Sequence, residues 1–325
     1  MTNNENQQAT VNISAELRAS TAAVRIRHRK LGVRKALTPA QRTSAADVFQ
    51  ADSSSLSASK RLLDTKNDAY KAVMSVRREA TEYWRRNTVV YPEPGLRLIK
   101  REKIASFDAE MKKFQGNLAE AVEALELCYN GMRLAAKDNL GSLYDAKDYP
   151  DTLEGEFELA WEYPSVEPPN YLKEIQPALY AAEQARIAAR FDEAVRLTEQ
   201  AMTEELSQLV GHLCDQLTGD NDGKPKVIRE SALANIQEFF TRFSEVGIRS
   251  NAELDALAAQ AKDLVAGIDA KGLRSNASAR ADMAAKMAEV RVKVDSMVVV
   301  RKRAISFEED EPAAAGEEHE FTLTA

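Results

Sequence analysis

Cysteine is scarce in this sequence, with only two residues among 325, and no long apolar run occurs. Cys128 and Cys214 each lie in a helical pattern, which favours buried thiols over a disulfide framework and fits a reducing compartment. No apolar stretch approaches the roughly 20 residues that a membrane-spanning helix needs. The first ten residues, MTNNENQQAT, lack the cationic start and apolar core of a secretion signal. We therefore expect a cytoplasmic protein without a membrane-spanning segment.

Histidine is also rare, and the three residues present do not suggest a metal site. His212 and Cys214 are two residues apart on an expected helix, so their side chains point to nearly opposite sides and cannot bind one ion alone. The sequence contains neither the Glu-x-x-His pair of a helical di-iron site nor the Gly-x-Ser-x-Gly turn of a serine hydrolase. These absences predict a protein that is not an enzyme, with no catalytic residues, no cofactor and no metal ligands.

One segment, TGDNDGKPKVIRE, has some features of a calcium-binding loop. It matches the loop pattern at Asp220, Asp222 and Gly223. However, Thr218 replaces the first aspartate, and Arg229 occupies the position of the bidentate glutamate. An Asp-Gly turn between two helices is the simpler interpretation, and a calcium site is the alternative.

Aromatic residues make up only 6% of the chain, whereas charged residues make up 29%. This composition, with abundant alanine, is typical of long helices with charged exposed faces. The formal net charge of −7 belongs to the C-terminal tail, because residues 304–325 contain seven acids and no lysine or arginine. We expect this acidic tail and residues 1–10 to be disordered, because both have little apolar surface to bury.

Residues 1–303, whose formal charges sum to zero, contain two clusters of opposite charge. Residues 138–167 contain nine acids and a single cation, Lys147. The preceding region contains a basic block of six residues, namely Arg25, Arg27, Arg29, Lys30, Arg34 and Lys35. Clustered cations bind phosphates irrespective of base sequence, so the block predicts an arm that contacts nucleic acid or a partner protein. The pI near 5.3 argues against a dedicated nucleic-acid-binding protein.

The segment YWRRNTVVYPEPGLRLIK, residues 83–100, interrupts an otherwise helical region. Two β-prone triplets flank the turn sequence Pro-Glu-Pro-Gly, which predicts a small hairpin near 88–99 that joins two helices. Trp84, Arg85 and Arg86 could instead form a surface that stacks bases and binds phosphates. Cations near a helix C-terminus and aromatic residues that anchor it explain the same residues more simply.

The clearest periodicity in the chain follows this segment. Apolar residues alternate in steps of three and four from residue 104 to residue 135, and we call this series the heptad seam: Ile104, Phe107, Met111, Phe114, Leu118, Ala121, Leu125, Cys128, Met132 and Ala135. Such a series predicts a helix of about 35 residues, roughly 50 Å long, with a partner helix along most of its length. The seam can pair within one chain or between two chains, so a homo-oligomer is possible.

Weaker patterns complete the expected architecture. Alternating apolar residues suggest a strand near 11–17 and another within VRIRHR, and residues 38–58 suggest a loop or a weak helix. A proline-rich break near residue 165 separates two helical regions. In the second region, Ser250 and Glu253 form a predicted capping box, and Asn276 opens the last helix.

The expected fold is therefore mainly α: an elongated antiparallel helical bundle or coiled coil with a small β element. We divide the chain into a disordered tail, a basic N-terminal segment, a helical segment with the heptad seam, a helical bundle and an acidic disordered tail. Their boundaries are 1–10, 11–58, 59–165, 166–303 and 304–325, respectively.

Three stretches taken in order resemble an uncharacterised bacterial and phage family, the domain-of-unknown-function family 3150. These are KRLLDTKNDAYKAVMSVRREATEYWRRNTVVYPEPGLRLIKREKI, the tripeptide DYP and VIRESALANIQEFFTRF. The resemblance extends over about residues 10–270. Members of that family are often encoded beside MoxR-type AAA+ ATPases on mobile elements. The resemblance implies an accessory role beside such an ATPase and implies no catalytic residues.

Two functional hypotheses follow from these observations. The first is a non-enzymatic scaffold or adaptor of phage or mobile-element origin that binds a partner protein through its helices or its acidic tail. The alternative is a nucleic-acid-associated protein that uses the basic block together with Arg85 and Arg86.

Overall fold

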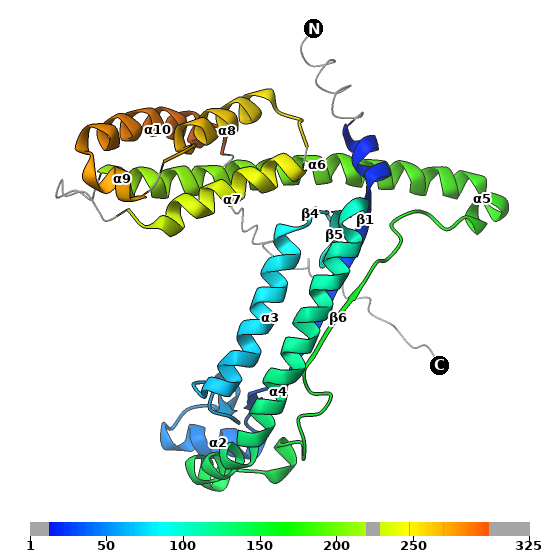
Figure 1. Ribbon diagram of the computed structural model, residues 1–325. Helices are drawn as coiled ribbons and strands as arrows, with labels where there is room; N and C mark the ends of the chain where they lie inside the picture. The colour runs from blue at the N-terminus through cyan, green and yellow to red at the C-terminus, as the bar shows by residue number, and fades with distance from the viewer. Residues whose placement is uncertain (1–12, 219–227, 247, 269, 299–325) are drawn as a thin grey trace, which may run out of the picture.

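The computed structural model describes residues 13–218, 228–246, 248–268 and 270–298. The predicted tails at 1–10 and 304–325 lie outside these residues, as does most of the TGDNDGKPKVIRE segment. The described chain is mainly helical with a small antiparallel sheet, as predicted. Figure 1 shows a T-shaped molecule in which two long helices form a stem and a second group of helices lies across its top as a crossbar.

Three helices belong to the stem: α2 (Pro39–Val48), α3 (Asp68–Arg86) and α4 (Ile104–Leu140). Asn67 caps α3, because its side-chain oxygen accepts hydrogen bonds from the amides of Ala69 and Tyr70. The 37-residue length of α4 confirms the long helix that the heptad seam predicts. Tyr83 stacks on Phe107 with 5.6 Å between ring centroids, so α3 covers the beginning of α4.

The heptad seam is buried only along part of α4. Phe107, Met111 and Leu118 are buried as predicted, but Cys128 and Ala135 are exposed. Tyr129 and Ala136, each one residue later, are buried in their place. A straight α-helix drifts by about 20° per heptad from a 3.5-residue repeat, so after four heptads the buried face has moved by nearly one residue. The expectation of a buried Cys128 thiol is therefore wrong, whereas Cys214 is buried.

The small sheet connects the stem to the crossbar. Its antiparallel strands follow the order β4–β5–β1–β6, with β1 at Thr21–Arg29, β4 at Val89–Val90, β5 at Arg97–Lys100 and β6 at Glu158–Glu162. The pairing of β4 with β5 confirms the predicted hairpin near 88–99. The strand predicted in VRIRHR is confirmed by β1. A separate two-stranded sheet pairs β2 (Arg34–Ala36) with β3 (Ser59–Arg61).

The strand predicted near 11–17 is wrong, because residues 13–20 are helical. Ser14 and Leu17 are buried, and their spacing of three residues is that of a helix face. The hydroxyl of Thr21 donates to the carbonyl of Leu17 at 2.6 Å, which ties the end of this helix to the start of β1. Four alternating apolar residues are too few to separate a strand from a short helix.

Five helices and a short leading turn of helix make up the crossbar. They are α5 (Tyr171–Ile175), α6 (Pro177–Thr218), α7 (Glu230–Val246), α8 (Ala252–Val265), α9 (Ala270–Ser275) and α10 (Ala277–Met297). In Figure 1, α7, α8 and α10 lie along one half of α6. Their shared core includes Leu206, Val210, Phe239, Leu257 and Met287.

Of the two helix caps predicted in the crossbar, that of α10 is correct and that of α8 is displaced by one residue. The side chain of Asn276 accepts from the amide of Ala279 and caps α10, as predicted. The capping box at Ser250 and Glu253 is wrong, because Asn251 is the residue that caps α8. The Ser250 hydroxyl instead donates to Glu199 at 3.0 Å, so a tertiary contact takes the serine away from the local cap.

The hairpin of β4 and β5 packs against the middle of α6, which fixes the stem to the crossbar. The ring of Tyr91 meets that of Phe191 edge-on, with centroids 5.5 Å apart. The turn between the strands uses Gly95 at φ +78°, a conformation that side-chain-bearing residues rarely adopt. The carboxylate of Glu93 in this turn pairs with Arg190 of α6 at 3.2 Å. We call this contact region the junction.

Candidate functional site

The basic block does not form a free cationic arm. Arg25, Arg27 and Arg29 lie on β1, whereas Arg34 and Lys35 lie on β2. Because β6 pairs with β1, the acidic stretch 138–167 runs beside the block. Arg27 pairs with Glu162 at 2.7 Å, and Arg29 pairs with Glu156 at 3.8 Å.

Two further cations of the block also have carboxylate partners. Arg25 lies 3.5 Å from Glu162 and 3.7 Å from Glu93, so it links β6 to the junction. Lys35 pairs with Asp148. Lys30 and Arg34 are exposed. Most of the block is therefore neutralised within the chain, which sequence alone did not reveal because all of these partners except Glu93 are more than 100 residues away.

The aromatic and basic residues at the end of α3 serve the junction. Trp84 is only 9% exposed, and the guanidinium of Arg97 lies 5.6 Å from its ring centroid. Arg86 pairs with Glu238 of α7 at 2.9 Å, whereas Arg85 is exposed. Because its ring is buried, Trp84 cannot stack on a base, and the structure does not bring these three residues together as a nucleotide-binding surface.

Arg97 holds the C-terminal end of α3. Its guanidinium donates to the hydroxyl of Thr88 at 2.7 Å and to the Thr88 carbonyl at 2.9 Å. Burial and, to a smaller extent, the nearby charge of Arg85 together lower the pKa of Arg97 to about 10. A cation at the negative end of a helix dipole stabilises that helix end.

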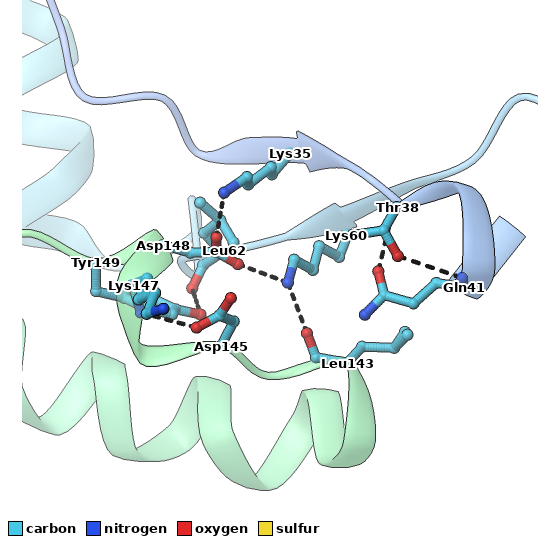
Figure 2. A network of polar contacts seen from close by, with 10 residues as sticks. All are labelled: Lys35, Thr38, Gln41, Lys60, Leu62, Leu143, Asp145, Lys147, Asp148 and Tyr149. Carbon is cyan, nitrogen blue, oxygen red and sulfur yellow. Dashed lines mark hydrogen bonds and ion pairs between the residues drawn. The ribbon is translucent and has the colours of Figure 1, made fainter.

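A second charged group of the stem is a buried clasp of three side chains, shown in Figure 2. Lys35 and Lys60 are directly opposite each other in the β2–β3 register, so both side chains lie on the same face. Both reach Asp148, which lies in a short turn after α4. The Nζ atom of Lys60 is 2.5 Å from Asp148 Oδ2 and donates to the Leu143 carbonyl at 2.7 Å.

Two of the three side chains of the clasp are nearly inaccessible to solvent. The side chains of Lys60 and Asp148 are 4% and 1% exposed, whereas that of Lys35 is 55% exposed. The contacts with Lys35 and with Lys60 lower the pKa of Asp148, so this carboxyl stays ionised at neutral pH. The hydroxyl of neighbouring Tyr149 donates to the Leu62 carbonyl at 3.0 Å.

The contacts of the clasp fit a structural role and not a catalytic one. A catalytic lysine must lose its proton and reach a substrate, whereas Lys60 is held between a carboxylate and a carbonyl. The three side chains fasten the β2–β3 sheet to the segment that follows α4. Sequence analysis missed this group, because Lys60 and Asp148 are 88 positions apart and neither belongs to a recognisable motif.

No metal centre is formed by the residues that the structure describes, since no three His, Cys, Asp or Glu side chains come close enough together. His212 is exposed and lies 2.8 Å from the amide nitrogen of Gln216, whereas Cys214 is buried in the crossbar core. His28 Nε2 lies 3.0 Å from the Thr81 hydroxyl, and burial lowers the pKa of this imidazole. The possible calcium ligands Asp220, Asp222 and Gly223 lie outside the described residues.

Exposed apolar side chains gather at three places on the described chain, one of which is Val48 and Phe49 at the end of α2, 77% and 76% exposed. Leu127 and Leu134 lie on α4 and are 89% and 60% exposed. Beside them, Cys128, Gly131 and Ala135 line a groove of about 700 Å³. The third place is the start of the crossbar, at Tyr171, Ile175 and Leu179.

No protein-family model, curated protein or solved structure matches the chain. No helix in the described part of the chain is both long enough and apolar enough to cross a membrane.

Proposed function

We propose that this protein is a cytoplasmic, non-enzymatic scaffold or adaptor that binds another protein through the exposed beginning of the crossbar. Three large apolar side chains occur there within nine residues. Tyr171 and Ile175 of α5 are 61% and 75% exposed, and Leu179 of α6 is 40% exposed. Clustered apolar surface of this kind marks protein interaction sites, whereas a single exposed apolar residue needs no explanation.

The observation that supports this proposal most directly is the lack of cover over the first turns of α6. Residues 177–186 bury no side chain, and Ile187 is the first buried residue of the helix. Figure 1 shows this end of α6, with α5 attached, extending away from the other crossbar helices. Helical segments of this length are marginal in water without tertiary packing, so a bound partner would stabilise the segment.

The family resemblance suggests a MoxR-type AAA+ ATPase as the partner and a phage or mobile element as the origin. A helical protein with exposed apolar ends is suited to an accessory role beside such a motor. The paired state of the basic block supports a protein partner over nucleic acid, because four of its cations already have carboxylate neighbours.

The proposal is tested with the purified chain and a purified MoxR-type ATPase encoded in the same genome. Titration calorimetry should detect binding, and Ile175→Glu should weaken it at least tenfold by placing a charge in the contact. Val292→Glu is the matched control, since Val292 of α10 is 71% exposed and isolated from this surface. Absence of binding, or equal losses in both variants, would refute the proposed contact.

The nucleic-acid alternative needs a separate measurement. Because Lys30, Arg34 and Arg85 are exposed, a gel-shift assay with duplex DNA and with RNA at low salt gives it the best chance. We expect no binding that survives moderate salt. Tight, salt-sensitive binding that is lost in an Arg34→Ala and Arg85→Ala double variant would favour nucleic acid instead.

A further inference from the structure

The second half of α4 exposes a second helical stripe, on the side opposite its buried residues. Its members are Ala124, Leu127, Gly131 and Leu134, all exposed, and we call this stripe the distal α4 face. The spacings of three, four and three residues place them on one side of the helix. This stripe has the heptad pattern of a helix-pairing surface, although no described element of the chain covers it.

Gly131 is unexplained by contacts within the chain. A Cβ atom built on Gly131 would meet nothing within 4 Å, so no neighbouring atom requires a glycine here. Glycine in a helix interior weakens the helix relative to alanine. Space above Gly131 would have a use if a large side chain from another molecule occupied it.

We propose that the distal α4 face binds the same face of a second copy of this chain, with the two α4 helices antiparallel. In one such register, Leu127 of one copy lies over Gly131 of the other, and Leu134 lies over Ala124. Each large side chain then meets a small one, and the two-fold symmetry repeats both contacts. The adjacent groove at Cys128 and Ala135 gives the leucines of the second copy room to enter.

Charge selects the antiparallel orientation over the parallel one. Glu123 and Lys137 are exposed beside the stripe, and each is seven residues from Asn130. In the antiparallel register, Glu123 faces the second copy's Lys137 on both sides of the two-fold axis. A parallel pair would place Glu123 beside Glu123 and Lys137 beside Lys137, and it would also place the leucines over each other.

The same register limits the length of the contact. The next positions outward bring Glu120 near the second copy's Asp138, and these like charges oppose further pairing. The apolar contact therefore covers residues 124–134, about 16 Å of helix at 1.5 Å per residue. A contact this short belongs to weak, reversible dimers, so we expect association to depend on protein concentration. This inference does not depend on the partner proposed above, which binds at the other end of the molecule.

Sedimentation velocity on the full chain at increasing concentration tests the dimer. The wild-type chain should shift from monomer to dimer, and Leu134→Glu should weaken dimerisation at least tenfold. Leu179→Glu, at an exposed crossbar position, should leave the dimer unchanged. A wild-type chain that stays monomeric, or a dimer that is insensitive to Leu134→Glu, would overturn the proposal.

A charge exchange tests the orientation. Glu123→Lys alone should weaken the dimer by placing lysine opposite Lys137, and Lys137→Glu alone should do the same. The double variant with both changes should restore the wild-type dimer. If the single variants weaken the dimer and the double variant does not restore it, the antiparallel register is wrong.

Cross-linking gives an independent measure. Cys128 is exposed and Cys214 is buried, and these are the only cysteines in the chain. Because Cys128 lies near the two-fold axis in this register, a short bismaleimide should link two copies of the native protein, and Cys128→Ala should abolish the product. Absence of a cross-linked dimer at concentrations where sedimentation shows association would overturn the register.

Discussion

The stem and the crossbar both combine an apolar core with hydrogen bonds and ion pairs between distant segments, but among the described ion pairs only that of Lys60 and Asp148, in the stem, is almost completely buried. In the stem, Lys60 and Asp148 are buried together, and the hydroxyl of Tyr129 donates to the Pro150 carbonyl at 2.9 Å. In the crossbar, Phe239 lies within 5.7 Å of both Phe240 and Phe243, as measured between ring centroids. The comparison teaches that two regions of one chain, each with an apolar core, can differ in whether a charged pair is buried beside that core.

The difference follows from the local architecture. The crossbar helices lie along one another, so regularly spaced apolar residues meet over many turns. The end of the stem is covered instead by short segments, namely β2, β3 and the turns that follow α4, which add only a few isolated apolar side chains such as Leu63 and Leu153 to the core. Specific polar contacts such as the Lys60 clasp hold these segments in place.

The largest effect is expected from a cavity in the crossbar. Phe239 is 0% exposed, so Phe239→Ala should lower the free energy of unfolding by about 3–5 kcal/mol. Urea denaturation followed by circular dichroism measures this loss. Val292→Ala, at an exposed position on α10, should change stability by less than about 0.5 kcal/mol. A loss below about 1 kcal/mol for Phe239→Ala would contradict the packed crossbar core.

The second effect concerns the clasp in the stem. Lys60→Met removes a cation from a buried carboxylate that keeps only Lys35, and it should cost about 1–3 kcal/mol. Lys112→Met is the control, because Lys112 forms a similar pair with Asp108 but is 67% exposed, and surface pairs contribute about 0–1 kcal/mol. Equal losses in the two variants would show that burial of the clasp has no energetic consequence.

A smaller effect, equal in both regions, is expected from the helix caps. Asn67 caps α3 in the stem and Asn276 caps α10 in the crossbar, each through its side-chain oxygen. Replacement of either residue by alanine should cost about 1 kcal/mol, because one amide at each helix start loses its acceptor. Denaturation of the two variants side by side measures both losses. A large difference between them would mean that the two regions differ in local helix stability as well as in their cores.

The last effect is that of protonating Asp148, which is absent at neutral pH and grows as the pH falls. Lys35 and Lys60 hold the pKa of this carboxyl below its ordinary value of about 3.9. Its contribution to stability is therefore complete above that ordinary value and is lost as the pH falls through the lower pKa of the folded state. Denaturation between pH 7 and pH 3 should show this loss in the wild-type chain, and Asp148→Asn should remove that part of the pH dependence. Unchanged acid sensitivity in the variant would contradict the assignment.

Sequence periodicity predicted the helices well and the contacts between distant segments poorly. The start and length of α4 followed from its seam, because apolar residues recur at regular steps whatever they pack against. The exposure of Cys128 did not follow, since a gradual drift of the buried face depends on how straight the helix is. The four residues of the basic block that find carboxylates do so through the pairing of β1 with β6 and through the fold of the turn after α4, which no local pattern indicates.

Each proposed interaction surface likewise combines a feature that the sequence predicts with one that only the structure shows. The exposed leucines of α4 fit the heptad pattern, but only the structure shows that they lie on the side of α4 opposite its buried residues. The exposed start of α6 follows the proline-rich break, and its lack of cover depends on where α7, α8 and α10 end. In both cases the pattern predicts an apolar helix face, and the placement of neighbouring elements decides whether it is buried.

Hydrogen exchange followed by mass spectrometry, at pH 7 and near pH 3 after correction for the intrinsic rates, tests the contrast between stem and crossbar most directly. If the buried Lys60–Asp148 pair holds the short stem segments in place and apolar packing holds the crossbar, acid should remove protection first from β2, β3 and the turns after α4, while α6 and α10 stay protected. Loss of protection in α6 and α10 before, or together with, those stem segments would contradict it.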